Sequence, residues 1–291
     1  MNHPLMTQGV WYDLALADGS CWGIAAGNEE AIFIVSQLGC IMQLRRCSGA
    51  IEPSNRVNLN RLLVQIDAHA SVSDWHVPLA SENDGVVVCV LRPSDFWGGP
   101  FLNLVRLSSI LAHEAQAHGG VLIHGALAER DGIGVILAAP GGTGKTTASN
   151  RLPVPWRSLC DDTTLVVRNP QGDYWAHPWP TWSRFMDGEP GGTWDVQKAV
   201  PVKGIFFLVQ AGKDRVDRVN SAQAVGLLGE SVGQSSGFMA SSLCKDELRA
   251  LHLEQFNNLC ILARVIPTHT LHISLTGTFW QEIEQTLWKT L

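Results

Sequence analysis

Apolar and polar residues alternate with a period of two across residues 10–24, which predicts two strands joined by a turn. Apolar side chains then recur at helical spacing over residues 29–45, and two further strands are predicted at residues 61–66 and 86–91. Nothing in this part of the chain indicates chemistry. We therefore predict an accessory α+β region in residues 1–100.

The pattern changes after the first hundred residues. Apolar residues spaced along one face of a helix predict a helix over residues 101–117. A strand at residues 121–129 and an apolar run at residues 133–138 flank Asp131-Gly132, which predicts an antiparallel hairpin. Strands are also predicted at residues 157–160, 164–168, 173–177, 203–209 and 271–275, and helices at residues 144–151, 221–228, 245–263 and 279–289. This order predicts an α/β domain over residues 101–291, in which helices flank a sheet.

Two segments of this domain are predicted to be loops. Residues 175–185 contain three tryptophans, His177 and Arg184, but two prolines disfavour a helix or a central strand. The rings are candidates for a platform under an adenine ring or a peptide side chain, with Arg184 contacting phosphate, and they could equally fill the core. Residues 233–237, Gly-Gln-Ser-Ser-Gly, match the nucleophile-elbow string of hydrolases. No apolar strand precedes them, so we predict a flexible loop instead.

The strongest chemical signal is the loop that follows the apolar run at residues 133–138. A strand, a glycine-rich turn, a lysine and a hydroxyl residue occur in the order of a Walker A P-loop, which binds nucleotide phosphates. The alternative, a glycine-rich turn that happens to precede a lysine, does not explain the whole order. The candidate nucleotide-binding residues are Ala139, Pro140, Gly141, Gly142, Thr143, Gly144, Lys145, Thr146 and Thr147.

Each residue type in this loop has a physical reason. Backbone amides can surround a phosphate only where no Cβ blocks the approach, which explains the three glycines, and the free N–H groups of the following helix add partial positive charge. We expect Lys145 to neutralise the outer phosphates of ATP and Thr146 to complete a Mg²⁺ shell. Ala139 stands where the pattern usually has glycine, which we expect to be tolerated because the residue ends a strand.

The second chemical signal is the adjacent carboxylate pair Asp161-Asp162, at the end of the strand predicted at residues 157–160. Ligand groups collect at the carboxyl ends of strands in nucleotide-binding folds, so the pair can supply a second Mg²⁺ contact and a general base. A solvated turn or a helix cap is the alternative, because aspartate is common in both. The position of the pair, a short way beyond Lys145, favours the functional interpretation.

Composition narrows the class of protein. The 291 residues are 45% hydrophobic and 16% charged, which excludes a disordered chain. A formal net charge of −6 disfavours nucleic-acid binding, and no apolar stretch approaches the length of a membrane span. The N-terminal residues 1–8 lack the cationic and apolar parts of a signal peptide, and the seven cysteines are scattered without a Cys-x-x-Cys pair. We therefore expect a cytoplasmic protein with reduced thiols.

The order of these segments resembles the HPr kinase/phosphorylase superfamily, whose nucleotide fold is similar to that of PEP carboxykinase. The resemblance is carried by the strand around His124 and Gly125, the turn at Asp131-Gly132, the P-loop through residues 144–146, and Asp161-Asp162. It implies an α/β kinase domain with a P-loop sheet. It also implies that Asp161 deprotonates an acceptor hydroxyl, that Asp162 binds Mg²⁺ with Thr146, and that His124 lies beside the transferred phosphoryl group.

The chain departs from this superfamily in two places. The arginine-rich signature near the C-terminus has no counterpart, and Thr147 stands where an acidic residue is usual. These departures indicate a divergent branch. The tryptophan-rich segment with its His-Pro-Trp-Pro string resembles the ScmC group of kinases from gene cassettes for modified peptides.

The resulting hypothesis is a Mg²⁺- and ATP-dependent kinase that phosphorylates a serine or threonine hydroxyl of a peptide or small protein. A small-metabolite kinase is the alternative enzyme, and a nucleotide-binding interaction protein that transfers no phosphate is the alternative from another class. The sequence leaves open the acceptor, a reverse phosphorylase activity, a homo-oligomeric state and the role of residues 1–100.

Overall fold

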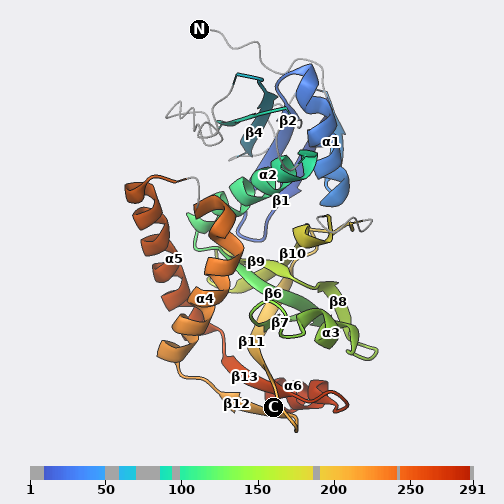
Figure 1. Cartoon of the computed structure of the whole chain (residues 1–291), viewed down its shortest axis with the longest axis vertical. Helices are drawn as coiled ribbons and strands as arrows, with labels where there is room; N and C mark the ends of the chain where they lie inside the picture. The colour runs from blue at the N-terminus through green and yellow to red at the C-terminus, as the bar shows by residue number, and fades with distance from the viewer. Residues whose placement is uncertain are drawn as a thin grey trace. The chain divides into compact units, whose positions relative to one another are not determined.

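The computed structural model of the chain describes residues 10–49, 59–69, 86–93, 99–185, 191–240 and 243–288 (Figure 1). The N-terminal residues 1–8, which carry the expectation of no signal peptide, lie outside this part. The chain splits into two compact units. Unit 1 comprises Met1–Leu111 and Trp182–Gln197, and unit 2 comprises Ala112–Thr181 and Lys198–Leu291. Both combine strands and helices, which confirms the predicted mixed α/β class.

Unit 1 contains a five-stranded sheet of order β3-β1-β2-β4-β5. The predicted hairpin is β1 (Val10–Ala15) paired with β2 (Cys21–Ala26), and the two strands predicted next are β4 (Leu59–Ile66) and β5 (Val86–Leu91). β2, β4 and β5 run parallel to one another. The helical elements of the unit are η1 (Glu29–Ala31), α1 (Ile32–Ile41), η3 (Trp182–Phe185) and the first part of α2 (Gly99–Gln116), which continues into unit 2.

The helix expected over residues 29–45 was predicted too long. It ends at Ile41, because Gln43 adopts a φ of 48° that no helix continues through. The chain then forms a strand that was not predicted, β3 (Arg45–Ser48), which pairs with β1. Arg45 forms an ion pair with the buried carboxylate of Asp13, so a charged pair holds this edge of the sheet.

Unit 2 is built on an eight-stranded sheet of order β10-β9-β6-β7-β11-β13-β12, with β8 paired to β6. β7, β11 and β13 are parallel, and the remaining pairs are antiparallel. A short pairing of β10 with β11 closes β9, β6, β7, β11 and β10 into a ring. The strands are β6 (Val121–Arg130), β7 (Ile133–Ala138), β8 (Arg157–Cys160), β9 (Thr163–Arg168), β10 (Tyr174–Trp179), β11 (Val200–Gln210), β12 (Arg215–Arg218) and β13 (Thr268–Ile273).

The turn between β6 and β7 fixes the strand that leads into the glycine-rich loop. Asp131 and Gly132 have φ angles of 54° and 78°, the left-handed pair that an Asp-Gly hairpin turn adopts most easily. The buried Glu129 carboxylate accepts hydrogen bonds from the Gly132 amide at 2.7 Å and from Nε of Arg157 at 2.7 Å. The predicted antiparallel pairing is therefore confirmed, and a buried carboxylate joins the turn to β8.

Helices cover both faces of this sheet. α3 (Lys145–Asn150) and α6 (Phe279–Leu287) lie on one face, and α4 (Ser221–Ala240) and α5 (Lys245–Val265) lie side by side on the other (Figure 1). The core under α3 and α6 is a single apolar cluster that includes Leu137, Phe206, Leu271, Phe279 and Ile283. None of the described helices is both long enough and apolar enough to cross a membrane. α6 ends at Leu287, and residue 289, where the predicted helix ends, lies outside the described residues.

The loop expected at residues 233–237 is a wrong prediction, because these residues continue α4. The helix extends through two glycines because its apolar stripe, Ala224, Leu228 and Val232, is buried. Tertiary packing therefore overrides the low helix propensity of this segment. The hydroxyls of Ser235 and Ser236 donate to the carbonyls four residues earlier, as serines within a helix do.

The loop expected at residues 175–185 is also partly wrong, because β10 runs through Pro178 to Trp179. Pro178 is tolerated because β10 pairs with β11 only at Trp175 and Ala176, so Pro178 faces a partner strand on one side only. Trp179 is 1% exposed, so its ring fills the core and offers no platform to a ligand. For this residue the alternative interpretation of the tryptophans is correct.

Candidate functional site

The candidate site is organised around the loop of residues 139–144, here called the glycine loop, which joins β7 to α3. Gly142 and Gly144 have φ angles of 76° and 104°, a region that favours glycine. A Cβ placed at Gly141, Gly142 or Gly144 would meet no atom within 4 Å. The loop backbone therefore faces open space, as a cradle for a phosphate must.

The helix after the glycine loop is shorter than the sequence analysis implies. α3 contains six residues, Lys145–Asn150, and begins with Gly144 as its N-cap. A helix of this length has a small macrodipole, so its contribution to anion binding is minor. Positive potential at the site must come instead from the amides of the glycine loop and from Lys145.

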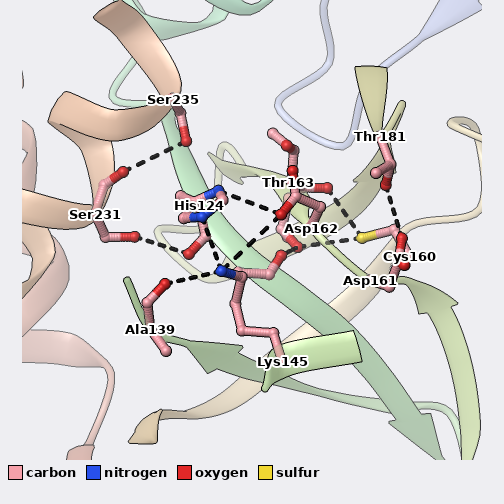
Figure 2. Close-up of polar contacts among 12 residues, drawn as sticks. His124, Ala139, Lys145, Cys160, Asp161, Asp162, Thr163, Thr181, Ser231 and Ser235 are labelled. Atoms are coloured by element: carbon pink, nitrogen blue, oxygen red, sulfur yellow. Dashed lines mark hydrogen bonds and ion pairs between the residues drawn. The ribbon is translucent and has the colours of Figure 1, made fainter. Parts of the chain in front are cut away.

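Lys145 is 5% exposed, and its ammonium is held by three groups (Figure 2). Nζ donates a hydrogen bond to the carbonyl oxygen of Ala139 at 2.9 Å and lies 2.8 Å from Nε2 of His124. Oδ1 of Asp162 lies 4.0 Å from the same nitrogen. The lysine, the histidine and one of the two aspartates predicted for the site therefore form one cluster.

Burial changes the acid–base properties of this cluster. It lowers the pKa of His124, which the nearby Lys145 charge lowers further, while the Asp162 carboxylate acts in the opposite direction. Burial likewise lowers the pKa of Lys145, and the Asp162 and Asp161 carboxylates partly offset this. A neutral His124 ring with its proton on Nδ1 satisfies both neighbours, because Nε2 then accepts from Lys145 and Nδ1–H faces Oδ1 of Asp162 at 3.5 Å.

The two adjacent aspartates have different surroundings. The side chain of Asp162 is 27% exposed and faces His124 and Lys145. Asp161 is 7% exposed, and its Oδ1 accepts a hydrogen bond of 2.8 Å from the hydroxyl of Thr181 (Figure 2). One carboxylate is therefore oriented by a buried hydroxyl, and the other is accessible beside the lysine.

A small hydrogen-bonded scaffold holds the strand that carries His124. The hydroxyl of Thr164 donates to the carbonyl of Gly125 at 2.8 Å, and the Cys160 thiol lies 3.4 Å from the same hydroxyl oxygen. Burial raises the pKa of Cys160 to about 11, so the thiol stays protonated and packs as an inert group. A Cβ on Gly125 would lie 2.9 Å from Cγ2 of Ile136, so only glycine allows β6 and β7 to approach this closely.

Helix α4 also reaches the cluster. The buried hydroxyl of Ser231 donates to the carbonyl oxygen of His124 at 3.1 Å (Figure 2). The sequence analysis missed Ser231 because it ended the helix at residue 228. The helical spacing of Ala224, Leu228 and Val232 is the signal that could have extended the helix past this residue.

A pocket of about 620 Å³ lies beside the glycine loop, at the carboxyl ends of β7 and β11. Its walls are residues 139–143 of the loop, residues 207–210 of β11, Thr270 of β13, and residues 227, 230, 231 and 234 of α4. The Gln210 side-chain amide donates to the carbonyl of Thr143 at 3.2 Å, which links β11 to the loop. The volume lies within the range of small-ligand pockets.

The structure brings several of the predicted site residues together. His124, Ala139, Lys145 and Asp162 are joined by the contacts above, and the Asp161 carboxylate acts on Lys145 only through its charge. Thr146 and Thr147 are exposed in the first turn of α3. Arg184 lies in η3, which belongs to unit 1, whereas the other predicted site residues belong to unit 2. Thr181 is a contributor that sequence reasoning did not single out, because nothing in the pattern indicated that it lies beside Asp161.

The donor set of the site suits a hard divalent cation. Thr146 offers a hydroxyl and Asp162 a partly exposed carboxylate, and oxygen ligands are what Mg²⁺ prefers. Within the described residues there is no group of three or more metal-ligating histidine, cysteine or acidic side chains. A Mg²⁺ bound through one or two side chains and substrate phosphates needs no such group.

Comparison with known proteins identifies the family. The model of the family described as SynChlorMet cassette protein ScmC matches residues 87–288. This match covers more than half of the chain, and the chain belongs to the ScmC family. A search of the curated proteins found no match.

Proposed function

We propose that this member of the ScmC family is a Mg²⁺- and ATP-dependent kinase that transfers a phosphoryl group to a serine or threonine hydroxyl of a peptide or small protein. We also propose that unit 2 is a divergent relative of the HPr kinase fold, with its PEP carboxykinase-like P-loop sheet. The order of the hairpin β6–β7, the glycine loop, α3 and the carboxylate pair after β8 supports this relation.

One observation carries the proposal. The Lys145 ammonium lies at the base of a loop with two left-handed glycines, within 2.8 Å of His124 and 4.0 Å of Asp162. A lysine, main-chain amides and acidic residues are groups that phosphoryl transfer uses, and here the histidine holds the lysine. A purely structural loop would not need a lysine that is 5% exposed.

The proposed roles follow from the surroundings of each side chain. Lys145 and the amides of the glycine loop would hold the outer phosphate oxygens, and His124 would position the ammonium through Nε2. Asp161, oriented by Thr181, would accept the proton of the acceptor hydroxyl. The hydroxyl oxygen then bonds to the γ-phosphorus, the bond from that phosphorus to the bridging oxygen breaks, and ADP leaves.

Thr146 and Asp162 are the residues that would hold Mg²⁺ in this proposal. The ion, when bound, would neutralise charge on the phosphates. Asp162 is more exposed than Asp161, which suits Asp162 as the metal ligand and Asp161 as the base.

The test compares the purified chain with Asp161→Asn in an assay with ATP, Mg²⁺ and a library of serine and threonine peptides, with mass spectrometry of the products. We expect phosphopeptides from the natural chain, and transfer lower by about 10²–10⁴-fold in the variant with ATP binding retained. Asp246→Asn, in the exposed first turn of α5, is the matched control.

The outcomes separate the alternatives. Full turnover by Asp161→Asn would show that the assigned base is wrong. Nucleotide binding without any phosphorylated product would favour an interaction protein, and transfer to a small hydroxyl compound but to no peptide would favour a metabolite kinase.

A further inference from the structure

The pocket beside the glycine loop adjoins the place where the transferred phosphoryl group is expected. Its loop wall is residues 139–143, whereas Lys145 and the threonines after it do not line it. In the P-loop pattern the lysine reaches the outer phosphates. Nζ of Lys145 donates a hydrogen bond to the carbonyl of Ala139, and Ala139 lines the pocket. The pocket therefore adjoins the end of the loop at which the lysine would hold the outer phosphates.

The helix wall of the pocket leads to the same cluster. Ser231 lines the pocket and donates to the carbonyl of His124, whose ring contacts Lys145 (Figure 2). The pocket and the Lys145 cluster therefore share residues from two different elements, the loop and α4. An occupant of the pocket would lie next to the reacting end of a bound nucleotide.

The charge of the pocket indicates what it receives. Glu230 is the one acidic residue among those that line it, and no lysine, arginine or histidine does so. Glu230 is exposed, and it forms no hydrogen bond or ion pair within the described part of the chain. A carboxylate here disfavours phosphate and favours a cation. Val209 and Leu227 add an apolar wall on which the aliphatic stem of a lysine or arginine can pack.

We propose that this pocket receives the acceptor, and that the acceptor is a peptide segment in which the serine or threonine is next to a lysine or arginine that pairs with Glu230. This inference rests on the proposed kinase function. A volume of about 620 Å³ accommodates the long basic side chain. Asp161 does not line the pocket, so the neighbouring serine or threonine would lie outside it, toward the Lys145 cluster, where Asp161 would accept its proton.

The test uses three octapeptides, each with one serine, flanked by two arginines, two glutamines or two glutamates. Phosphorylation is measured with ATP and Mg²⁺, and binding is measured separately by fluorescence anisotropy of the labelled arginine peptide. We expect the natural chain to prefer the arginine peptide. Glu230→Gln should raise its KM about tenfold, the size expected for a lost charge-assisted hydrogen bond, and leave the KM for ATP unchanged. Glu230→Lys should shift the preference to the glutamate peptide, while Asp246→Asn should change neither.

Two results would overturn the proposal. If Glu230→Gln weakens nucleotide binding and leaves the peptide unaffected, the pocket holds the nucleoside part of ATP. If Glu230→Lys leaves the order of the three peptides unchanged, Glu230 does not select the acceptor. Should the natural chain phosphorylate no peptide, the kinase proposal fails, but the anisotropy measurement still tests what the pocket binds. Binding of the arginine peptide that Glu230→Lys abolishes would support a basic occupant, and an absence of binding would exclude one.

Discussion

The Nζ atom of Lys145 lies 2.8 Å from Nε2 of His124, so the first residue of α3 is tied to the middle of strand β6. The histidine can accept this hydrogen bond only while it is neutral, and burial lowers its pKa in that direction. The lysine ammonium is thereby held beside the carbonyl of Ala139, the first residue of the glycine loop.

Lys145→Met should remove nucleotide binding without unfolding the domain. The methionine keeps most of the apolar stem in a site that is 5% exposed, but it lacks the charge that the phosphates need. We expect the affinity for a fluorescent ATP analogue with Mg²⁺ to fall about 10–100-fold, measured by titration, with an unchanged circular dichroism spectrum. A variant that binds the analogue as well as the natural chain does would contradict the assignment of Lys145.

Thr181 should act as a positioning residue for Asp161. Its buried hydroxyl donates to Oδ1 of Asp161 at 2.8 Å, so Thr181→Val leaves the carboxylate without this orientation. We expect kcat to fall about tenfold with little change in the KM for ATP, and Thr181→Ser to restore most of the loss because it returns the donor. Equal rates for the valine and serine variants would indicate packing rather than positioning.

The glycine next to His124 should be sensitive to a single methyl group. In Gly125→Ala the added Cβ would lie 2.9 Å from Ile136 and 3.2 Å from the carbonyl oxygen of Leu137. We expect the free energy of unfolding to fall by about 1–3 kcal/mol, as in other overpacked cores, measured by urea denaturation. Gly226→Ala is the matched control, because its Cβ meets nothing within 4 Å on an exposed face of α4. This control should raise stability by about 0.5–1 kcal/mol, and a loss of stability there would show that helix α4 is strained.

Two histidines should make the folded state acid-sensitive. Burial lowers the pKa of His124 and of His269 below the ordinary value of 6.5. The ring of His269 stacks on Phe206, and neither of its nitrogens has a hydrogen-bond partner within the described residues. Below about pH 6.5 the unfolded chain takes up protons that the folded chain refuses, so stability rises with pH in this window and falls as the pH drops.

Urea denaturation at several pH values between 7.5 and 5 measures this dependence. His269→Gln should weaken the dependence of the free energy of unfolding on pH, because it removes one of the two titrating histidines. The further change His124→Gln should weaken this dependence again. A pH dependence that the double variant leaves intact would assign the effect to carboxylates instead.

Much of the site was predictable because its signals are local. The β-branched run of β7, the glycines and the Asp131-Gly132 turn specify their own backbone conformations. The structure contains the strand and the turn as predicted, and α3 is slightly shorter than predicted. The pair Asp161-Asp162 was placed from the strand before it, and Asp162 does lie beside Lys145. Short-range sequence patterns are therefore sufficient to predict this part of the site.

The missed features depend on contacts between distant residues. Thr181 meets Asp161 only because β10 continues through Pro178, and a proline in a candidate strand ordinarily argues against that strand. Ser231 meets His124 only because packing extends α4 through glycines and serines that disfavour a helix alone. The edge strands β3 and β12 are short and polar, so an apolar alternation could not indicate them.

Unit 1 is formed from two separate stretches of the chain, Met1–Leu111 and Trp182–Gln197. The second stretch is tied to the first by main-chain hydrogen bonds, such as that from the amide of Trp194 to the carbonyl of Ile41 at 2.7 Å. A nascent chain that has left the ribosome only as far as residue 111 therefore lacks part of its first unit. Unit 1 is therefore complete only after residues 182–197 have been synthesised, and the seventy intervening residues 112–181 leave the ribosomal tunnel before them.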